Sequence, residues 1–488
     1  MDRRDFIKSA TALAVASSTG GFSGCTITAG DTPMSTQLRS LVLSPIAEDP
    51  GSELSAQGHW PADLQGTLFR NGPTLFSRNG DSQDHLFDGD GMVHAYRING
   101  GKIRHRSRYV QTEKFVQEQQ ANKFLYSGSA SARTASLPMR TNDTINMANI
   151  SVRKVGKRYY ALWEGGSAYE IDPNTLATRS RITLSPELEH APFSAHPLQD
   201  TNGDTWNFGS LVNIGQAKTL LYQLGPNGYL KRKQLIDMDF PGYMHAFALS
   251  QNYIILLNTA CIHQPAETFV GGYTFHQDKP SQFIFIDKNN LEVKRTIEVP
   301  ANFVFHFGNA FEEGGKLLLT ASEYNNANIM LKGMALNTHD GLGAGYSAGN
   351  MVQYEFELTT GHYKKSSTFV DLEFPQYDLT KPYLAQTLFG AGETGNKKNN
   401  IANALVAINP TTLHHQTFSY AKGIIAEEPL LVRSKTNQQY IIQTFIDVKN
   451  RNGGIALFEP ARIANGPIAL ATTQAPIPLG FHGCFVAS

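Results

Sequence analysis

The stretch YEIDPNTL, residues 169–176, contains a short alternating apolar run followed by a turn of Asp, Pro and Asn. Alternation with a period of two is typical of a half-buried strand, and these turn residues favour chain reversal, so the stretch predicts a β-hairpin. The same pattern recurs six more times along the chain. The other stretches are YRINGGKI (96–103), YQLGPNGYL (222–230), IFIDKNNLEV (284–293), YEFELTTGHY (354–363), VAINPTTL (406–413) and ALFEPARIANGPIAL (456–470).

Seven hairpins with one repeated pattern indicate a repeat architecture. Their mean spacing of roughly 60 residues is somewhat longer than a minimal propeller blade. We therefore predict an all-β fold, a seven-bladed β-propeller with long insertions between strands. A pair of β-sandwiches is the alternative, because hairpins occur in any β protein. Helical patterning is scarce, and its best candidate is TEKFVQEQQANKFLY (112–126).

Composition excludes several classes of function. The chain carries 42 basic and 42 acidic residues. This balance gives no electrostatic reason to expect nucleic acid or an anionic membrane surface as a partner. There are only three cysteines, Cys25, Cys261 and Cys484, which rules out a disulfide framework and any multi-cysteine zinc module.

The N-terminus is typical of a targeting segment. Arg3 and Arg4, followed by Phe-Ile-Lys and an Ala-rich run, match the twin-arginine export pattern, with two chance arginines as the alternative. We therefore assign 1–35 to an export signal with a short linker and 36–488 to a single propeller domain, which predicts a periplasmic protein. The stretch FSGC ending at Cys25 is similar to a lipoprotein cleavage box, although Phe22 stands where Leu is usual. Whether a lipid on Cys25 anchors the protein to a membrane stays open.

Four of the fifteen histidines share one sequence context, an apolar or small residue before them and a strand-like run after them. They occur in FSAHPLQD, GYMHAFALS, FVFHFGNAF and GFHGCF, as His196, His245, His306 and His482. Matching points of different propeller blades converge on the axis, so these imidazoles are predicted to meet there. Neutral nitrogen ligands suit Fe, Cu, Ni or Zn, and three histidines with water fit catalytic zinc. Four histidines favour an ion of higher coordination number, with open positions for oxygen chemistry.

Metal-bound histidines usually donate their second N–H to a carboxylate or carbonyl group. Three glutamates lie in apolar sequence surroundings that suit this task. They are Glu164 in YYALWEGG, Glu373 in VDLEFP and Glu428 in EEPLLV. A solvated position at a sheet edge is the alternative for each of them.

Several motifs in order resemble the carotenoid cleavage oxygenase family, whose non-haem iron enzymes split conjugated double bonds with O2. The resemblance covers about residues 40 to 488. Its motifs are GTLFRNGPTLF (66–76), DHLFDGDGMVHAY (84–96), LWEGGSAYEIDP (162–173), FSAHP (193–197), MHAF (244–247), FHFGNAFEE (305–313), EFP (373–375) and PLGFHG (478–483). It implies a seven-bladed propeller capped by a dome of loops and short helices over an iron centre.

The resemblance also implies roles for the site residues. His196, His245, His306 and His482 would bind Fe(2+). Glu164, Glu373 and Glu428 would orient His245, His306 and His482 respectively, while His196 would lack a carboxylate partner. His94, in a family motif, would be structural rather than a ligand.

The activity implied is cleavage of one conjugated C=C bond of a carotenoid or apocarotenoid by O2, giving two carbonyl products. A related stilbene dioxygenase is the main alternative, but such enzymes typically have Lys where this chain has Trp163. A non-catalytic propeller that binds ligands is the other alternative. The segment 112–128 is similar to the apolar mouth of apocarotenoid-cleaving members, which predicts peripheral membrane contact; ordinary packing is the alternative.

Two positions depart from the family pattern. Ala246 replaces an acid in the usual Met-His-Asp-Phe motif, which bears on local packing because the acid is not a ligand. Ile150 stands where many members have Thr over an open iron position. The isoleucine is expected to shield that position sterically but to lack the hydroxyl.

Overall fold

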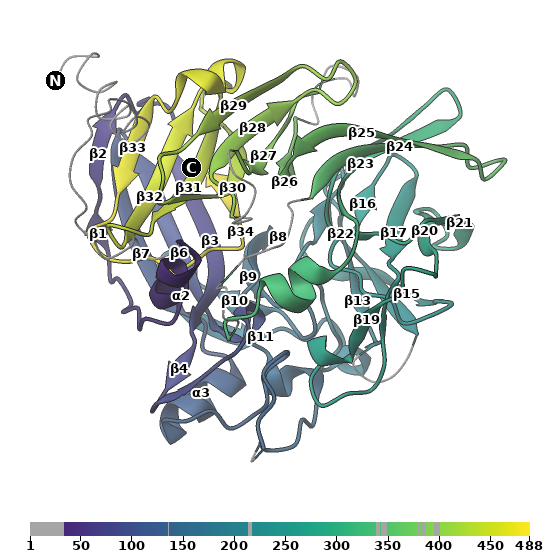
Figure 1. The fold of residues 1–488 in the computed structure, drawn as a ribbon, viewed down its shortest axis with the longest axis horizontal. Helices are drawn as coiled ribbons and strands as arrows, with labels where there is room; N and C mark the ends of the chain where they lie inside the picture. The colour runs from purple at the N-terminus through teal and green to yellow at the C-terminus, as the bar shows by residue number, and fades with distance from the viewer. Residues whose placement is uncertain are drawn as a thin grey trace, which may run out of the picture.

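The computed structural model describes residues 34–488, apart from 135, 213–216, 338–341, 343–348, 379–380, 382–385 and 395–400. Within these residues, seven antiparallel sheets of four or five strands follow one another around a centre. Figure 1 shows the chain passing from sheet to sheet around the molecule until the last sheet lies beside the first. The predicted seven-bladed propeller is confirmed, and the pair of β-sandwiches is wrong.

The first four blades contain the C-terminal strand β34 and most strands up to residue 299. Their strands are given from the innermost outward. They are β34 (His482–Ala487), β3 (Gly66–Leu75), β6 (Asp90–Asn99), β7 (Lys102–Tyr109) and β1 (Ser52–Glu53); β8 (Ser151–Val155), β9 (Arg158–Leu162), β10 (Tyr169–Ile171) and β11 (Thr178–Arg181); β12 (Leu198–Gln199), β13 (Thr205–Ser210), β14 (Lys218–Leu224) and β15 (Leu230–Asp237); β16 (Ala248–Leu249), β17 (Tyr253–Asn258), β20 (Ser281–Asp287) and β21 (Val293–Val299).

The remaining three blades complete the ring, and two short ribbons, β4–β5 and β18–β19, lie outside it. The strands of these blades and ribbons are β22 (Phe303–Glu313), β23 (Lys316–Tyr324), β24 (Asn350–Phe356) and β25 (Tyr363–Asp371); β26 (Glu373–Gln376), β27 (Leu388–Gly392), β28 (Ala404–Ile408) and β29 (His415–Ser419); β30 (Ile424–Arg433), β31 (Gln439–Asp447), β32 (Asn452–Phe458), β33 (Ala469–Thr472) and β2 (Ser55–Gly58); β4 (Ser77–Arg78), β5 (Asp81–Ser82), β18 (Cys261–His263) and β19 (Tyr273–Phe275).

All seven predicted hairpins join the third and fourth strands of their blades. In the blade of β10 and β11, the Asp172 carboxylate accepts hydrogen bonds from the backbone N–H groups of Asn174 and Thr175, both at 2.9 Å. Asn409 binds the matching N–H groups in the hairpin of β28 and β29. A short polar side chain therefore closes the turn, which is why one sequence pattern recurs at these positions.

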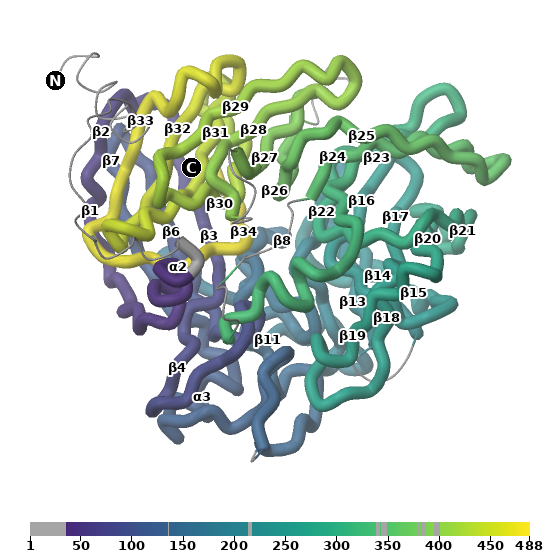
Figure 2. The backbone as a smooth tube through the Cα atoms, in the orientation of Figure 1, coloured from purple at the N-terminus to yellow at the C-terminus, as the bar shows by residue number. Residues whose placement is uncertain are grey.

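The two ends of the described chain close the ring. The C-terminal β34 pairs antiparallel with β3, so His482 lies opposite Asn71. At the next joint the N-terminal β2 adds to the last blade by pairing with β33, and Figure 2 shows this purple segment beside the yellow one. The strand-like run expected after His482 is therefore observed as β34.

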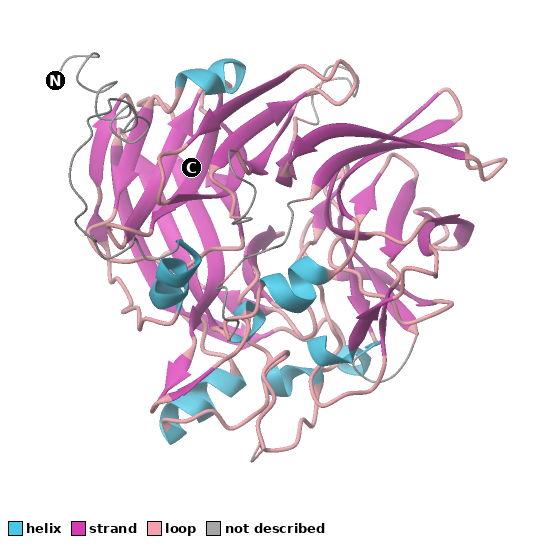
Figure 3. Ribbon diagram, in the orientation of Figure 1, coloured by secondary structure: helices cyan, strands magenta, loops and turns pink. Residues whose placement is uncertain are grey.

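Within the described residues the helical segments are few and short, and most of them lie outside the sheets in Figure 3. They are α2 (Met34–Val42), α3 (Glu113–Ala121), η1 (Leu86–Asp88), η2 (Asn142–Ile145), η3 (Pro186–Leu188), η5 (Val270–Gly272), η6 (Ile329–Gly333) and η8 (Pro460–Asn465). Residues of α2 and η1 pack with Leu336, just after η6, in one apolar cluster. These segments form part of the predicted dome.

The helix predicted within 112–126 is α3. The Thr112 hydroxyl caps its N-terminus by accepting from the Phe115 amide, and the left-handed backbone of Asn122 ends it. Phe115 and Phe124 are buried, with the guanidinium of Arg78 over both rings. This burial favours packing over a membrane-facing mouth for these side chains. None of the described helices has the length and apolarity needed to cross a bilayer. Most of the predicted export signal, with Cys25, lies outside the described residues.

Candidate metal centre

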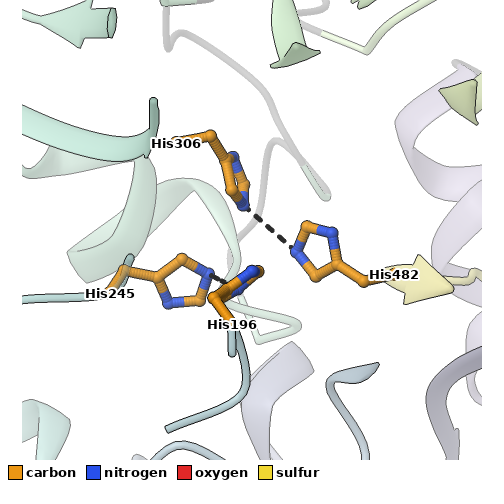
Figure 4. A group of neighbouring side chains, drawn as sticks. All are labelled: His196, His245, His306 and His482. Carbon is orange, nitrogen blue, oxygen red and sulfur yellow. Dashed lines mark hydrogen bonds between the residues drawn. The ribbon is translucent and has the colours of Figure 1, made fainter. Parts of the chain in front are cut away.

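Four histidines enter the centre of the ring from four different blades. His306 lies within β22 and His482 begins β34, while His196 and His245 lie in the segments leading into β12 and β16. These are the innermost strands of their blades, so each strand or its lead-in delivers one imidazole to the axis. Figure 4 shows the four rings pointing toward one another.

The nitrogen atoms of the four rings lie close enough to share one ion. Nε2 of His196 is 2.9 Å from Nε2 of His245, and Nε2 of His306 is 3.1 Å from Nε2 of His482. One ligand atom from each ring lies within 4.8 Å of those of the other three, and all four residues are buried. The predicted convergence is confirmed.

Three glutamates hold the outer nitrogens of three rings. Nδ1 of His245 is 2.7 Å from Glu164, Nδ1 of His306 is 2.7 Å from Glu373, and Nδ1 of His482 is 3.0 Å from Glu428. The predicted pairing of each glutamate with its histidine is therefore observed. No carboxylate among the described residues hydrogen-bonds to His196.

This arrangement fits a metal cation. A carboxylate accepts the Nδ1 proton, so the Nε2 atoms of His245, His306 and His482 turn their lone pairs toward the centre. Burial lowers the pKa of His196 and His482 well below the usual value, which keeps these rings neutral and able to bind metal. Facing lone pairs at 3.1 Å repel each other without a cation between them. Four converging imidazoles therefore form a metal site.

Three residues that orient the glutamates were missed by the sequence analysis. The Tyr243 hydroxyl donates to Glu164 at 2.9 Å and the Tyr324 hydroxyl to Glu373 at 2.6 Å. The Arg70 guanidinium forms a buried ion pair with Glu428. Two of them lie inside or beside quoted motifs, Arg70 in GTLFRNGPTLF and Tyr243 just before MHAF. A buried polar residue in such a motif is the signal that could have found them.

An apolar cavity of about 200 Å³ opens beside His245, His306 and His482. Four phenyl rings line it, from Phe87, Phe305, Phe374 and Phe481. Aliphatic side chains from α2, η6 and β30 complete much of the wall. The site thus combines a metal-binding floor with walls suited to a hydrocarbon chain.

The two departures from the family pattern lie in or near this wall. Ile150 is buried and lines the cavity, and its carbonyl oxygen accepts a hydrogen bond from the His482 amide at 3.1 Å. Ala246 is also buried. Trp163 packs in the same apolar cluster as Ile150. These positions therefore carry apolar groups close to the histidines.

His94 takes no part in the centre. Its Nδ1 lies 2.9 Å from Nε2 of His105, whose Nδ1 lies 2.8 Å from the carboxylate of Asp49. This buried chain of hydrogen bonds joins β6 and β7 to the segment before β1. It agrees with the structural role expected for His94.

Comparison with known proteins assigns the family. The family model described as retinal pigment epithelial membrane protein matches residues 44–487. The chain belongs to the carotenoid cleavage oxygenase family. The fold agrees, because the crystal structure of cobalt-substituted Synechocystis ACO covers 93% of this chain and 99% of its own, with a TM-score of 0.82 and 26% sequence identity.

Two named relatives match different shares of this chain. The apocarotenoid-15,15'-oxygenase of Synechocystis sp. is 37% identical over 290 residues, 55% of this chain and 58% of that protein. The carotenoid 9,10(9',10')-cleavage dioxygenase 1 of Pisum sativum is 24% identical over 500 residues, 91% of this chain and 88% of that protein. The match thus spans less than three fifths of the Synechocystis protein and most of the pea protein.

Proposed function

We propose that this chain is a non-haem Fe(II) dioxygenase that cleaves a conjugated C=C bond of a carotenoid or apocarotenoid with O2, giving two carbonyl products. The observation that carries the proposal is the apolar, phenyl-lined cavity lying directly against the cluster of four histidines. The names of the Synechocystis and pea relatives agree with this class of substrate.

The four histidines would hold the iron through neutral nitrogen atoms. Iron(II) in such a site supplies redox chemistry with O2, to which it can pass electron density. Glu164, Glu373 and Glu428 act on the histidines rather than on the substrate, since their oxygen atoms accept the Nδ1 protons. They fix the ring orientation and raise the basicity of the inner nitrogens. We expect no acid or base from the protein in the cleavage step.

The cavity wall positions the substrate and excludes water. Rings of Phe305, Phe374 and Phe481 next to the histidines give a polyene a close apolar contact on its flat faces. The length of chain that fits between wall and metal then determines which bond lies at the centre. Trp163 in place of Lys, together with this wall, favours a polyene over a phenolic stilbene.

The test is aerobic incubation of the iron-loaded protein with an apocarotenal, following loss of polyene absorbance and the masses of the products. Two carbonyl fragments that together equal substrate plus O2 are expected. His482→Ala should abolish both iron binding and bleaching. His414→Ala, at an exposed histidine outside the centre, is the matched control and should change neither. If wild-type protein with iron bound bleaches no polyene, the proposal is wrong and a hydroxystilbene becomes the next substrate to test.

We also propose that residues 1–35 direct export through the twin-arginine route, with a periplasmic destination. A site filled before export would escape competition from copper and zinc, which bind nitrogen ligands more tightly than iron(II) does. Replacing Arg3 and Arg4 by Lys should retain the protein in the cytoplasm. Unchanged export would contradict this route.

A further inference from the structure

Two neighbouring glutamates of β30 face the same side of the strand, although successive residues of a regular strand point to opposite faces. The register explains this. Ala426 pairs with Phe445 and Pro429 pairs with Gln443, so β30 advances three residues while β31 advances two. The extra residue makes a β-bulge, a feature that re-aims side chains next to active sites. As a result, Glu427 and Glu428 both approach Arg70.

Arg70 makes its short contacts with groups other than Glu427. Its Nη1 binds Glu428, and its Nη2 donates to the Phe481 carbonyl oxygen at 3.1 Å. The Glu427 Oε2 atom lies 4.0 Å from Nη2, beyond hydrogen-bond reach. Its Oε1 atom accepts from the Gly480 amide at 2.6 Å. The Thr444 hydroxyl also acts as a donor toward this carboxyl. The Glu427 carboxyl is thus held by two donors on the protein side, and its remaining lone pairs can accept from a further partner.

The Glu427 side chain lines the substrate cavity. Glu427 is buried and lines the cavity beside apolar residues, among them Ile425, Leu479 and Phe481. Burial raises the pKa of Glu427, and the attraction of Arg70 opposes this shift without cancelling it. A protonated carboxyl donates as well as accepts a hydrogen bond, and a carboxylate accepts, so Glu427 can bind a hydroxyl in either form. In an apolar wall, such a group without a partner is costly when the substrate displaces water.

We propose that Glu427 binds an oxygen-bearing end group of the polyene, a hydroxyl or a carbonyl, and so selects oxygenated substrates over hydrocarbons. This inference rests on the proposed function and names the class of substrate. A hydrocarbon would cover the cavity side of the Glu427 carboxyl and offer it no hydrogen bond there, whereas an alcohol or aldehyde would form one. Sites built to bind a polar group discriminate strongly for this reason.

The position of Glu427 also bears on which bond is cleaved. Glu427 binds the backbone of Gly480, and His482 follows two residues later on the same segment. The oxygen anchor and the metal site are therefore fixed to one short stretch of backbone. Binding of the oxygenated end at Glu427 would therefore fix which double bond of the polyene lies beside the four histidines.

The test uses the full-length, iron-loaded protein and three polyenes with the same number of conjugated double bonds, a hydrocarbon, an alcohol and an aldehyde. The measured quantity is kcat/KM for each, together with Kd from absorbance titration without O2. Wild-type protein should favour the alcohol or the aldehyde over the hydrocarbon. Glu427→Leu should reduce that preference by about 10- to 100-fold. The substrate whose kcat/KM falls, the alcohol or the aldehyde, identifies the group that Glu427 binds. Ile425→Val, an apolar change in the same wall, is the matched control and should leave the preference unchanged.

A preference equal in wild type and Glu427→Leu would overturn the proposal. If the leucine variant does not fold, Glu427→Asp keeps a carboxyl group on the side of Arg70 but withdraws it from the cavity. The aspartate variant should show a several-fold smaller preference for the oxygenated substrate than wild type. An unchanged preference would again overturn the proposal. Failure of the proposed function would give a different result from failure of this proposal. Wild-type protein would then cleave none of the three polyenes, while the Kd values measured without O2 would still show which of them binds most tightly.

Discussion

Replacing Glu428 by Gln tests how the buried carboxylates support the histidines. Glu428 accepts hydrogen bonds from three donors. Its Oε1 faces Nδ1 of His482 at 3.0 Å, and its Oε2 faces the Gly483 amide at 2.9 Å and the guanidinium of Arg70. A glutamine has only one acceptor oxygen, and its other atom is an NH2 donor. In either orientation, that NH2 group meets a donor.

Each orientation of the new amide has its own consequence. With the oxygen toward His482, the NH2 group faces Gly483 and the buried Arg70, whose charge loses its nearest acidic partner. With the oxygen toward Gly483 and Arg70, the NH2 group favours a ring without the Nδ1 proton, which then carries the proton on Nε2 and cannot bind metal. We expect iron affinity to fall by roughly 10- to 100-fold, about 1.4–2.8 kcal/mol. An unmet buried donor should also lower the free energy of unfolding by about 1–3 kcal/mol.

The other two glutamates provide graded controls. Oε1 of Glu373 accepts from the Tyr324 hydroxyl, which can turn and accept from an NH2 group instead. At Glu164, both the Tyr243 hydroxyl and His245 bind the same Oε2 atom. Glutamine at 373 or 164 can therefore keep its oxygen on the histidine, and both variants should lose less iron than Glu428→Gln.

The assay is iron content after anaerobic loading, with the dissociation constant measured by chelator competition and stability by urea unfolding. The order of losses is the decisive result. Equal losses in all three variants would refute the reasoning from donors and acceptors. Wild-type iron affinity in Glu428→Gln would refute any role of this carboxylate in holding His482.

Three further predictions concern the fold around the site. Lys114→Met removes a buried ammonium that lies 2.8 Å from Asp90 and 2.9 Å from Glu118. Among the described residues, Arg78 then remains as the one cation beside both acids, so we expect the free energy of unfolding in urea to fall by about 3–5 kcal/mol. No fall would show that Arg78 alone is enough to neutralise the two acids. Gly483→Ala would place a Cβ atom 1.9 Å from a backbone oxygen of the paired strand, so we expect loss of soluble folded protein, and normal yield would contradict this. Burial lowers the pKa of His94 in the folded state below 6.5. The unfolded chain therefore takes up a proton at this histidine first, and stability falls below pH 6.5 by up to about 1.4 kcal/mol per pH unit. Urea unfolding of metal-free protein at several pH values measures this dependence of stability on pH, and His94→Gln should reduce it.

The outer parts of the blades could be predicted from the sequence because their pattern is local. Most hairpin turns are closed by their own Asp or Asn side chain or by glycine, and an outer strand such as β7 alternates between buried and more exposed positions. The innermost strands give no such signal. β12 and β16 are two residues long, and nearly every side chain of β30 is buried. Such strands are defined by contacts with neighbouring blades, which a local pattern does not contain.

The site divides in the same way. The four histidines share a sequence context, and the three glutamates lie in apolar sequence surroundings, so both sets could be identified from the sequence. The resemblance supplied the pairing between them. Arg70 could be noticed as a polar residue inside a motif, but its role and that of Glu427 could not be assigned, because both depend on pairing between strands far apart in the sequence. The acidic pair at 427 and 428 reads as an ordinary alternation, and only the bulge in β30 turns both side chains toward Arg70.

Ring closure and completion of the metal site are the same structural event. His482 is the first residue of β34, whose pairing with β3 closes the propeller, and its amide binds Ile150 just before β8. A metal held by His482 and by histidines from three other blades therefore stabilises the joint, by about 2.7 kcal/mol when free metal exceeds its Kd 100-fold. We expect metal removal to speed hydrogen exchange of the β34 amides, while exchange in the outer hairpin of β10 and β11 stays the same. Equal acceleration in both would mean that the metal stabilises the whole fold evenly, and no change in β34 would mean that the strand pairing holds the ring closed without it.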